Sequence, residues 1–261
     1  MESIILSRRD FREFDQIISL YTKEKGKMEL LARGVKKVIS KNTAHLEPCS
    51  YVQADIVPGK EIDHLIRVQP INFFSSIRQH VHASLAVQYG MNLFDALVHV
   101  HEPDQRLFHL LKSWLRYIDQ AKEYRELLLD SFVLKLFSLL GVQPILDRCV
   151  VCEKPYSHIV RDELSDVPGE NRLHPGFYVS AGGIICQTCR AGKEKSGENI
   201  VTVGMKEVGD MEILLRAEWV VISRMSIGER DYENLHRLVY QFAVFHSERR
   251  IGDWARLMKI L

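Results

Sequence analysis

Short apolar runs separated by turn-forming residues fill the chain from Met1 to Phe73, and this pattern is typical of β-strands. Five such runs lie at residues 3–7, 17–22, 28–32, 51–57 and 65–68. The run 51–57 alternates as a half-buried strand does, and the turn at 24–27 joins two runs into a predicted hairpin. Short strands packed so closely along the sequence favour a small closed barrel, because closure removes exposed strand edges.

Beyond residue 75 the apolar positions recur every three or four residues, which predicts amphipathic helices. The first helix is expected to begin at a Ser75 or Ser76 cap and to bury Ile77, Val81, Leu85, Leu93, Ala96, Leu97 and Val100. The second is expected from about Pro103 and buries Leu107, Leu110, Leu111, Trp114, Leu115 and Ile118. The third, from about Tyr124, ends at Gly141 and Pro144 and buries Leu127, Leu128, Phe132, Leu136, Phe137 and Leu140.

Helical spacing returns near Val203, with one stripe at Met205, Val208, Met211 and Leu215 and a last long one at Leu235, Leu238, Val239, Phe242 and Phe245. Helices on both sides of residues 147–199 thus carry apolar stripes, which they are expected to bury together in one helical domain. The predicted domains are a barrel at 1–74, a helical domain at 75–146 with 200–261, and an insert at 147–199.

Four cysteines form two Cys-x-x-Cys pairs inside the insert, namely Cys149 with Cys152 and Cys186 with Cys189. Two such turns facing each other complete a tetrahedral Zn²⁺ site of four thiolates. Four sulfurs leave no open position for water, so such an ion builds structure and performs no chemistry. The motif therefore predicts one structural zinc ion per chain.

Other uses of these cysteines stay open at this point. Two disulfides would need an oxidising compartment, and a redox pair would need one Cys-x-x-Cys beside a strand–helix unit. Asp147, His158 and His174 lie nearby in the sequence and are substitute ligands. Cys49 is far from the motif and is interpreted as a small buried hydrophobe.

Charge is balanced over the 261 residues, with a formal net charge of +1, so no global field favours nucleic acid. Between Lys23 and Lys41, however, seven Lys or Arg face only two Glu. No window approaches the length of a membrane span and no signal peptide is recognisable, so we expect a cytoplasmic protein without membrane contact.

A small barrel with a basic loop is a common platform for single-stranded nucleic acid, where cations follow the phosphates and aromatic rings stack on bases. The candidate cations are Arg8, Arg9, Arg12, Lys25, Lys27, Arg33, Lys36 and Lys37. Phe11, Phe14 and Tyr21 are candidates for stacking, although filling the barrel core is the favoured role for each ring. A solvated surface explains the cations equally simply.

No catalytic motif is recognisable. The clustered histidines, His80, His82, His99, His101 and His109, lack the zinc-protease spacing and are interpreted as surface or capping residues. No phosphate-binding glycine loop and no nucleophile elbow occurs, so an enzyme is not expected. A metalloenzyme that uses these histidines is the least favoured alternative.

Several segments resemble the bacterial recombination mediator family RecO. They are residues 4–9, 13–15, Thr22 with Gly26 and Lys27, 32–37 with Ser40, and 46–48. The most specific match joins 139–144 and 146–152 to 177–189, which includes both cysteine pairs. Two departures are Arg12 before Glu13, where the family often has a small or turn residue, and Cys49, where it more usually has an aromatic.

The resemblance implies an α+β multidomain protein with an N-terminal OB-fold β-barrel and a C-terminal α-helical domain with an inserted four-cysteine zinc finger. It implies a non-enzymatic DNA repair protein that binds single- and double-stranded DNA, anneals complementary strands and, with RecR, helps load RecA onto strands coated by single-stranded DNA-binding protein (SSB). A cytoplasmic, nucleoid-associated location would follow. The alternative is a zinc-stabilised protein–protein adaptor without direct DNA binding.

Overall fold

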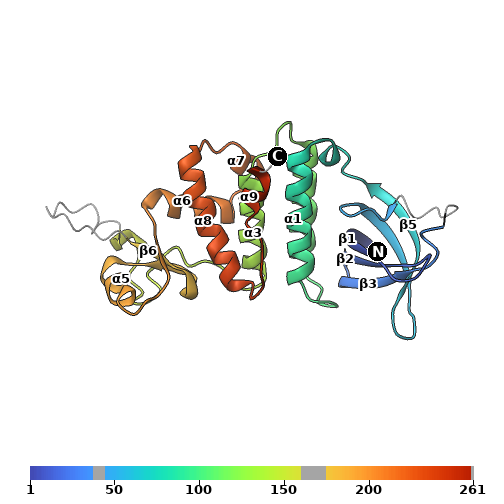
Figure 1. Cartoon of the computed structure of the whole chain (residues 1–261), viewed down its shortest axis with the longest axis horizontal. Helices are drawn as coiled ribbons and strands as arrows, with labels where there is room; N and C mark the ends of the chain where they lie inside the picture. The colour runs from blue at the N-terminus through green and yellow to red at the C-terminus, as the bar shows by residue number, and fades with distance from the viewer. Residues whose placement is uncertain (38–44, 160–174, 260–261) are drawn as a thin grey trace. The chain divides into compact units, whose positions relative to one another are not determined.

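The computed structural model of the chain describes residues 1–37, 45–159 and 175–259 (Figure 1). Ser40, Lys41 and His174, which entered the sequence interpretation, lie outside these residues. The chain forms two compact units, Met1–Phe132 with Trp254–Leu261, and Val133–Asp253. The border between the units lies inside the third helix, whereas the division into three domains that the sequence suggests stays a prediction.

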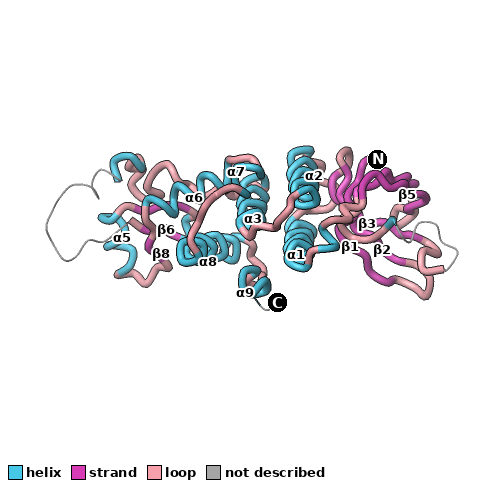
Figure 2. The backbone as a smooth tube through the Cα atoms, turned by 90° about the horizontal axis from the view of Figure 1, so that it is seen from above, coloured by secondary structure: helices cyan, strands magenta, loops and turns pink. Residues whose placement is uncertain are grey.

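A five-stranded closed barrel forms the N-terminal part of the first unit. Its strands, coloured magenta in Figure 2, are β1 (Glu2–Asp10), β2 (Gln16–Thr22), β3 (Gly26–Ala32), β4 (Tyr51–Val57) and β5 (His64–Asn72). Their order around the barrel is β1-β2-β3-β5-β4, and β4 pairs with β1 to close it. Every predicted strand is present, and the hairpin at the 24–27 turn is confirmed by the antiparallel pairing of β2 with β3.

The barrel is held by an apolar core that alternate strand positions supply, because successive side chains point to opposite faces. The core consists of Ile5, Ile18, Leu20, Met28, Leu30, Ala32, Val35, Leu46, Val52, Ala54, Leu65 and Val68. Strand β1 carries an irregularity between Ile5 and Ser7, where its register against β2 shifts. The OB-like fold class is thereby confirmed for this region.

Three helices follow the barrel: α1 (Val81–Leu97), α2 (Gln105–Gln120) and α3 (Leu127–Leu139), with a short 3-10 turn η2 (Ile77–Gln79) before α1. The predicted stripes of α2 and α3 are confirmed at every named position except Leu140, which follows α3 and is half-buried. Asp104 caps α2 by accepting a hydrogen bond from the Arg106 amide at 2.7 Å. Gly141 follows α3 with a φ of +90°, the backbone that a C-terminal glycine provides.

The predicted stripe of α1 is wrong at most of its positions, since only Ile77 and Leu93 are buried. The helix begins at Val81 with His80 as its N-cap, and Val81 itself is 62% exposed. The buried face is instead formed by Ala83, Ala86, Val87, Gly90, Met91, Leu93 and Phe94. Small residues carry much of this face, and a pattern of large apolar residues does not detect them.

The second unit contains a three-stranded sheet of β6 (Gly176–Tyr178), β7 (Gly183–Ile185) and β8 (Ile200–Thr202), in the order β7-β6-β8. A 3-10 turn η3 (Val179–Ala181) and helix α5 (Gln187–Glu194) accompany it. The helices α6 (Met205–Arg216), α7 (Trp219–Ser223) and α8 (Glu229–His246) follow, and α9 (Trp254–Lys259) returns to the first unit.

The predicted stripes of α6 and α8 are buried except at Met205 and Phe245, which are exposed. Within the described residues, none of the helices combines the length and the apolar character that crossing a bilayer requires.

Candidate metal centre and nucleic-acid interface

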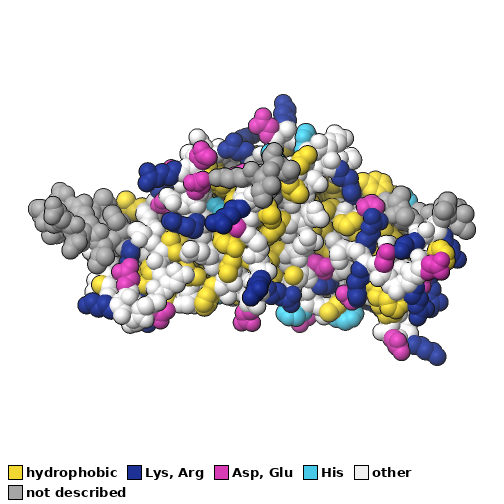
Figure 3. Space-filling view, viewed as in Figure 1, with side chains coloured by type: hydrophobic (Ala, Val, Ile, Leu, Met, Phe, Trp, Pro, Cys, Tyr) yellow, Lys and Arg dark blue, Asp and Glu magenta, His cyan; other side chains and the backbone are white. Residues whose placement is uncertain are grey.

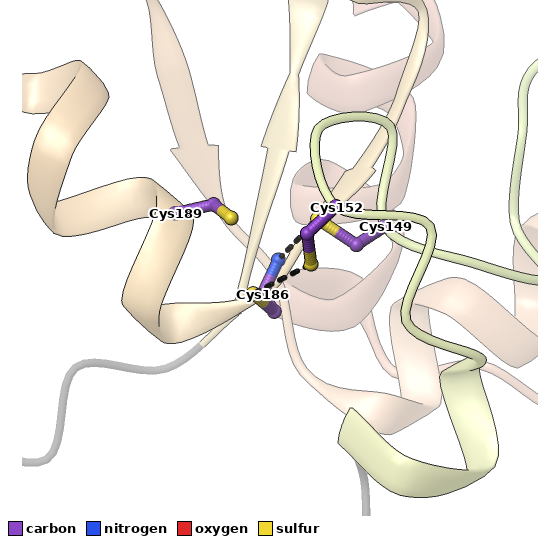
Figure 4. Close-up of side chains that lie close together, drawn as sticks. All are labelled: Cys149, Cys152, Cys186 and Cys189. Atoms are coloured by element: carbon purple, nitrogen blue, oxygen red, sulfur yellow. Dashed lines mark hydrogen bonds between the residues drawn. The ribbon is translucent and has the colours of Figure 1, made fainter.

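The sulfur atoms of Cys149, Cys152, Cys186 and Cys189 converge in the second unit (Figure 4). All four lie within 4.8 Å of one another, and the Cys152 and Cys186 sulfurs are 3.8 Å apart. A tetrahedral Zn²⁺ with Zn–S bonds of about 2.3 Å requires sulfurs about 3.8 Å apart. The donor set and its spacing therefore fit a structural zinc ion, and the predicted convergence of the two pairs is confirmed.

Each cysteine pair is positioned by a short local structure. The first pair lies in a tight turn in which the Cys149 amide donates to the Lys154 carbonyl at 2.8 Å and the Glu153 amide donates to the Cys149 carbonyl at 2.9 Å. Glu153 adopts a φ of +59°, which lets this turn close. In the second pair Cys186 is the N-cap of α5 and Cys189 lies in its first turn, directly after strand β7.

Backbone amides already favour a thiolate at this site. Burial raises the pKa of the Cys149 thiol, but amides of Cys186, Cys152 and Val151 outweigh it and lower that pKa to about 7. The Cys186 amide donates to the Cys149 sulfur at 3.4 Å. Burial and the neighbouring thiols raise the pKa values of Cys186 and Cys189, as expected when four acidic groups share one site. A divalent cation would offset the repulsion between the thiolates and lower the pKa values of all four, because a coordinated thiol is deprotonated.

The alternative ligands are not part of this centre. Among the described residues, the four cysteines form the one group of at least three His, Cys, Asp or Glu whose ligand atoms converge, so Asp147 and His158 are not included. Cys49 lies outside the group, and no two described cysteines are bonded to each other. The five clustered histidines are all exposed and form no such group either, consistent with surface roles.

Two loops meet at one end of the barrel, and we call them the basic tip: the β1–β2 turn of residues 11–15 and the loop of residues 33–37 after β3. The Lys36 amide donates to the Phe14 carbonyl at 3.1 Å, and the Gly34 amide donates to the Asp15 carboxylate at 2.8 Å. Gly34 has a φ of +64°, so a glycine suits this turn. Residues from distant parts of the sequence are thereby held in one surface.

Aromatic rings and cations alternate on the basic tip. The Arg12 guanidinium lies 5.1 Å from the centre of the Phe11 ring, and the Lys37 ammonium lies 5.7 Å from the centre of the Phe14 ring. Phe11 is 47% and Phe14 is 43% exposed, so the expected core role is wrong for both rings. Tyr21, by contrast, is buried, as the core interpretation predicts. The sequence signal that could have found this exposure is that both Phe residues fall in a polar turn between two strands, and such turns usually lie on the surface.

The candidate cations differ in whether a carboxylate already pairs with them. Lys25, Arg33 and Lys37 are exposed and have no acidic partner among the described residues. Arg8, Arg9 and Lys36 form surface ion pairs with Glu47, Glu29 and Asp10, at 2.9, 3.3 and 2.7 Å respectively. Exposed pairs of this kind are weak and exchange readily for a phosphate.

Lys27 is placed differently from the other candidates. Its ammonium lies 2.8 Å from the Asp95 carboxylate on α1, and its side chain is 14% exposed. Ser7 and Ser19 also donate to this carboxylate, each at 2.8 Å. This arrangement ties the barrel to α1 and engages Lys27 inside the unit, so Lys27 is poorly placed to contact DNA.

The face shown in Figure 3 has dark-blue Lys and Arg side chains over the barrel, with yellow hydrophobic patches among them. The basic tip contributes its paired rings and cations to the surface of the barrel. A surface that offers both ring faces and cations suits bases and phosphates of a single strand.

Two family models match the chain, "Recombination protein O N terminal" over residues 1–74 and "Recombination protein O C terminal" over residues 78–164. The chain is 28% identical over 251 residues to the DNA repair protein RecO of Desulforamulus reducens, covering 96% of this chain and 90% of that protein. It is 27% identical over 257 residues to the protein of the same name from Pelotomaculum thermopropionicum, covering 98% and 92%. The corresponding protein of Thermobifida fusca is 28% identical over 253 residues, covering 96% and 94%.

Proposed function

The chain belongs to the RecO family of DNA repair proteins, and from this premise we propose that it binds single- and double-stranded DNA at the basic tip and anneals complementary strands. The observation that supports the proposal is the arrangement of Phe11 with Arg12 and Phe14 with Lys37 on an exposed turn. DNA as the ligand would place the protein at the nucleoid in the cytoplasm.

Annealing requires two polyanions to approach each other. Cations on the tip neutralise phosphates and release condensed counterions, which favours binding most at low salt. The exposed rings stack on unpaired bases irrespective of sequence, because every base has a π-face. No covalent bond forms or breaks, so this activity needs no catalytic residue.

The same proposal includes the protein partners that the family resemblance implies. We propose that the chain acts with RecR on strands coated by SSB, and that RecA is loaded indirectly as the coat is displaced. Binding of strands by the basic tip would supply the step on which these partners depend, because a strand must be held while its coat is displaced.

The four-cysteine centre has a structural part in this proposal. One Zn²⁺ would be held by the four thiolates and would cross-link the two turns that carry Cys149 with Cys152 and Cys186 with Cys189. Four thiolates fill a tetrahedral ion, so no position remains for a water or a substrate. The surrounding residues position the sulfurs, as the hydrogen bond from the Cys186 amide to the Cys149 sulfur illustrates.

The test is annealing of complementary oligonucleotides, one of them coated with SSB, followed across a salt series. We expect acceleration that fades as salt rises. The double variant Arg33→Glu with Lys37→Glu should bind a single strand more weakly, with a log K versus log salt slope reduced by roughly 1.4, since each lost phosphate contact contributes about 0.7. Both side chains are exposed, so the folded state should persist.

The matched control is Lys195→Glu with Arg224→Glu, which makes the same charge change at exposed positions of the second unit. It should leave the affinity and the salt slope close to those of the unchanged protein. If the two double variants behave alike, the basic tip is not the binding surface. If the unchanged protein neither binds DNA at low salt nor accelerates annealing, the adaptor interpretation takes its place.

A further inference from the structure

A cavity of about 440 Å³ lies within the first unit, between strand β1, the segment before β4, and helix α1. Its floor is apolar and includes Leu6, Phe74, Ile77, Val87 and Met91, all of which are buried. The volume is in the range of small-ligand pockets in proteins. The basic tip does not include this recess, whose lining combines the apolar floor with polar side chains.

Polar side chains surround the apolar floor. Arg8 and Arg78 contribute two guanidinium groups, and Gln88 and Asn92 contribute exposed amides from two successive turns of α1. Arg78 donates to the Pro48 carbonyl at 3.0 Å and has no acidic partner among the described residues. Neither amide side chain has a hydrogen-bond partner among the described residues. Glu47 also lines the cavity, and its carboxylate pairs with the Arg8 guanidinium at 2.9 Å. A phosphate would take the place of this carboxylate at Arg8, whereas Arg78 and the two amides are free to bind it directly.

One wall of the cavity has a strained backbone. Cys49 adopts a φ of +70°, which residues with a side chain seldom do. The conformation is held by hydrogen bonds at 2.9 Å from the Cys49 amide to the Ile5 carbonyl and from the Ile5 amide to the Ser50 carbonyl. Burial raises the pKa of the Cys49 thiol to about 12, so the thiol is neutral at physiological pH and extends the uncharged wall.

We propose that this cavity receives one unstacked nucleobase of a single strand, with the adjoining phosphate held by Arg8 and Arg78. This inference rests on the DNA binding proposed above and names a second contact for the same strand. An apolar floor accepts the ring, and the amides of Gln88 and Asn92 suit the polar edge of a base. In a single strand the base has no pairing partner to lose, which lowers the free energy needed to turn it outward.

Continuity with the basic tip favours a nucleic acid over a peptide as the occupant. Arg8 lines the cavity and lies on β1, the strand that leads directly into the β1–β2 turn. Arg8 and Phe11 are three residue steps apart along extended chain, a distance of about 10 Å. A strand stacked on the tip rings is thereby led past Arg8 towards the cavity.

The experiment uses the full chain and a single-stranded oligonucleotide that carries photoreactive 5-iodouracil. Cross-linked peptides are identified by mass spectrometry. We expect cross-links to the cavity residues Phe74 or Met91 in addition to the tip rings. The variant Gln88→Trp fills the cavity from an exposed position and should remove the cavity cross-links. It should also weaken binding of the base-bearing strand by about 10-fold, in the range of one lost base contact.

The matched control is His82→Trp, because His82 is exposed on the same helix and does not line the cavity. It should keep both the cross-links and the affinity, and equal thermal unfolding of the two variants excludes a folding defect. An oligonucleotide of the same length with abasic positions should bind the unchanged protein more weakly than the base-bearing oligonucleotide does. In the Gln88→Trp variant the two oligonucleotides should differ less in affinity.

Cross-links confined to Phe11 and Phe14, with Gln88→Trp equal to its control, would overturn the cavity proposal and leave the tip proposal intact. Absence of any DNA binding at low salt would overturn both. If Gln88→Trp leaves DNA binding unchanged but abolishes binding of an acidic peptide with an apolar carboxyl-terminal residue, the cavity is a peptide site and the nucleobase proposal is wrong.

Discussion

The barrel and the metal module, by which we mean residues 147–159 and 175–202, are both built on a small β-sheet, yet they are stabilised differently. The barrel has strands of seven to nine residues and twelve buried apolar residues at its centre. The strands of the metal module are three residues each. Its buried side chains include Phe177, Val179, Ile184 and Ile185, together with the sulfurs of Cys149 and Cys186.

The comparison shows how strand length decides what a fold needs. Long paired strands bury enough apolar surface to offset the loss of conformational entropy. Three-residue strands cannot do this, and small structures of that kind commonly depend on a metal ion. A metal ion held by the two Cys-x-x-Cys turns would supply a cross-link in place of a larger core. We therefore expect loss of metal to destabilise the metal module and to leave the barrel unchanged.

Loss of one metal ligand should have the largest effect. Cys152→Ser removes a thiolate from a closed four-sulfur centre, and the binding free energy of a structural zinc ion is about 10–16 kcal/mol in small zinc-binding peptides. We expect metal content to fall from one ion per chain to near zero and amide exchange in residues 175–202 to become fast. Zinc analysis and hydrogen-exchange mass spectrometry measure the two results.

The barrel provides the internal reference for this experiment. Amides of β2 and β3 should keep their protection in the Cys152→Ser variant, because no ligand lies in the barrel. Cys49→Ser is the matched control substitution and should leave metal content unchanged. Unaltered exchange in the metal module after metal loss would show that its own core suffices, and the contrast drawn above would fail.

The partly buried ion pair of Lys27 and Asp95 tests the barrel side of the comparison. Asp95→Asn leaves the Lys27 ammonium, 14% exposed, without its carboxylate partner. Removing one member of a buried pair typically costs 3–5 kcal/mol, and partial exposure lowers our expectation to about 2–4 kcal/mol. Asp10→Asn is the matched control at the exposed pair with Lys36 and should leave the free energy of unfolding close to that of the unchanged protein. Urea unfolding measures both.

The pH dependence has a defined sign. Burial raises the pKa of Asp95, but hydrogen bonds from Lys27, Ser19 and Ser7 outweigh it and lower the pKa below the usual 3.8. The stability that this pair contributes is therefore fully present above pH 3.8 and is lost as the pH falls through the folded-state pKa. The difference between the unchanged protein and Asp95→Asn should stay constant from neutral pH to about pH 5 and shrink below about pH 4. A difference that shrinks already between pH 7 and 5 would contradict this assignment.

Sequence reasoning succeeded where one physical signal dominated. Short apolar runs between turn residues predicted the barrel strands, and large apolar residues at helical spacing predicted α2 and α3. Cysteine spacing predicted the convergence of four sulfurs, because a tight turn fixes where two thiols point. In each case the local pattern and the tertiary environment favour the same structure.

The sequence pattern was insufficient where contacts between distant segments decide whether a side chain is buried, paired or exposed. Lys27 and Lys25 are both lysines of the same predicted hairpin. The position of Asp95 on α1 is what places Lys27 in a partly buried ion pair and leaves Lys25 exposed. Phe11 and Phe14 were assigned to the core because aromatic residues are usually buried. The cavity joins segments from four parts of the chain, so no local pattern could predict it.

The smallest expected effect concerns the buried face of α1, which includes small residues that the predicted stripe did not contain. A Cβ at Gly90 would lie 2.5 Å from the Trp114 ring. That ring cannot yield easily, because it stacks on Phe132 with 4.0 Å between ring centres and its Nε1 donates to the Leu128 carbonyl at 3.1 Å. Overpacking a core typically costs 1–3 kcal/mol, and replacing a helical glycine by alanine returns up to about 1 kcal/mol. We therefore expect Gly90→Ala to destabilise the first unit by about 1 kcal/mol.

Gly209→Ala is the matched control for this change, because Gly209 lies in α6 and an added Cβ there meets nothing within 4 Å. It should stabilise its helix by about 0.5–1 kcal/mol, so the same substitution has opposite signs in the two units. Urea unfolding of both variants measures the signs. If Gly90→Ala is as stabilising as Gly209→Ala, then α1 and α2 do not approach closely, and α1 lacks a packing reason for its glycine. If the signs differ, Gly90 marks a close contact between α1 and α2 whereas Gly209 marks none, and a search for apolar stripes should allow small residues such as Ala83, Ala86 and Gly90 on the buried face.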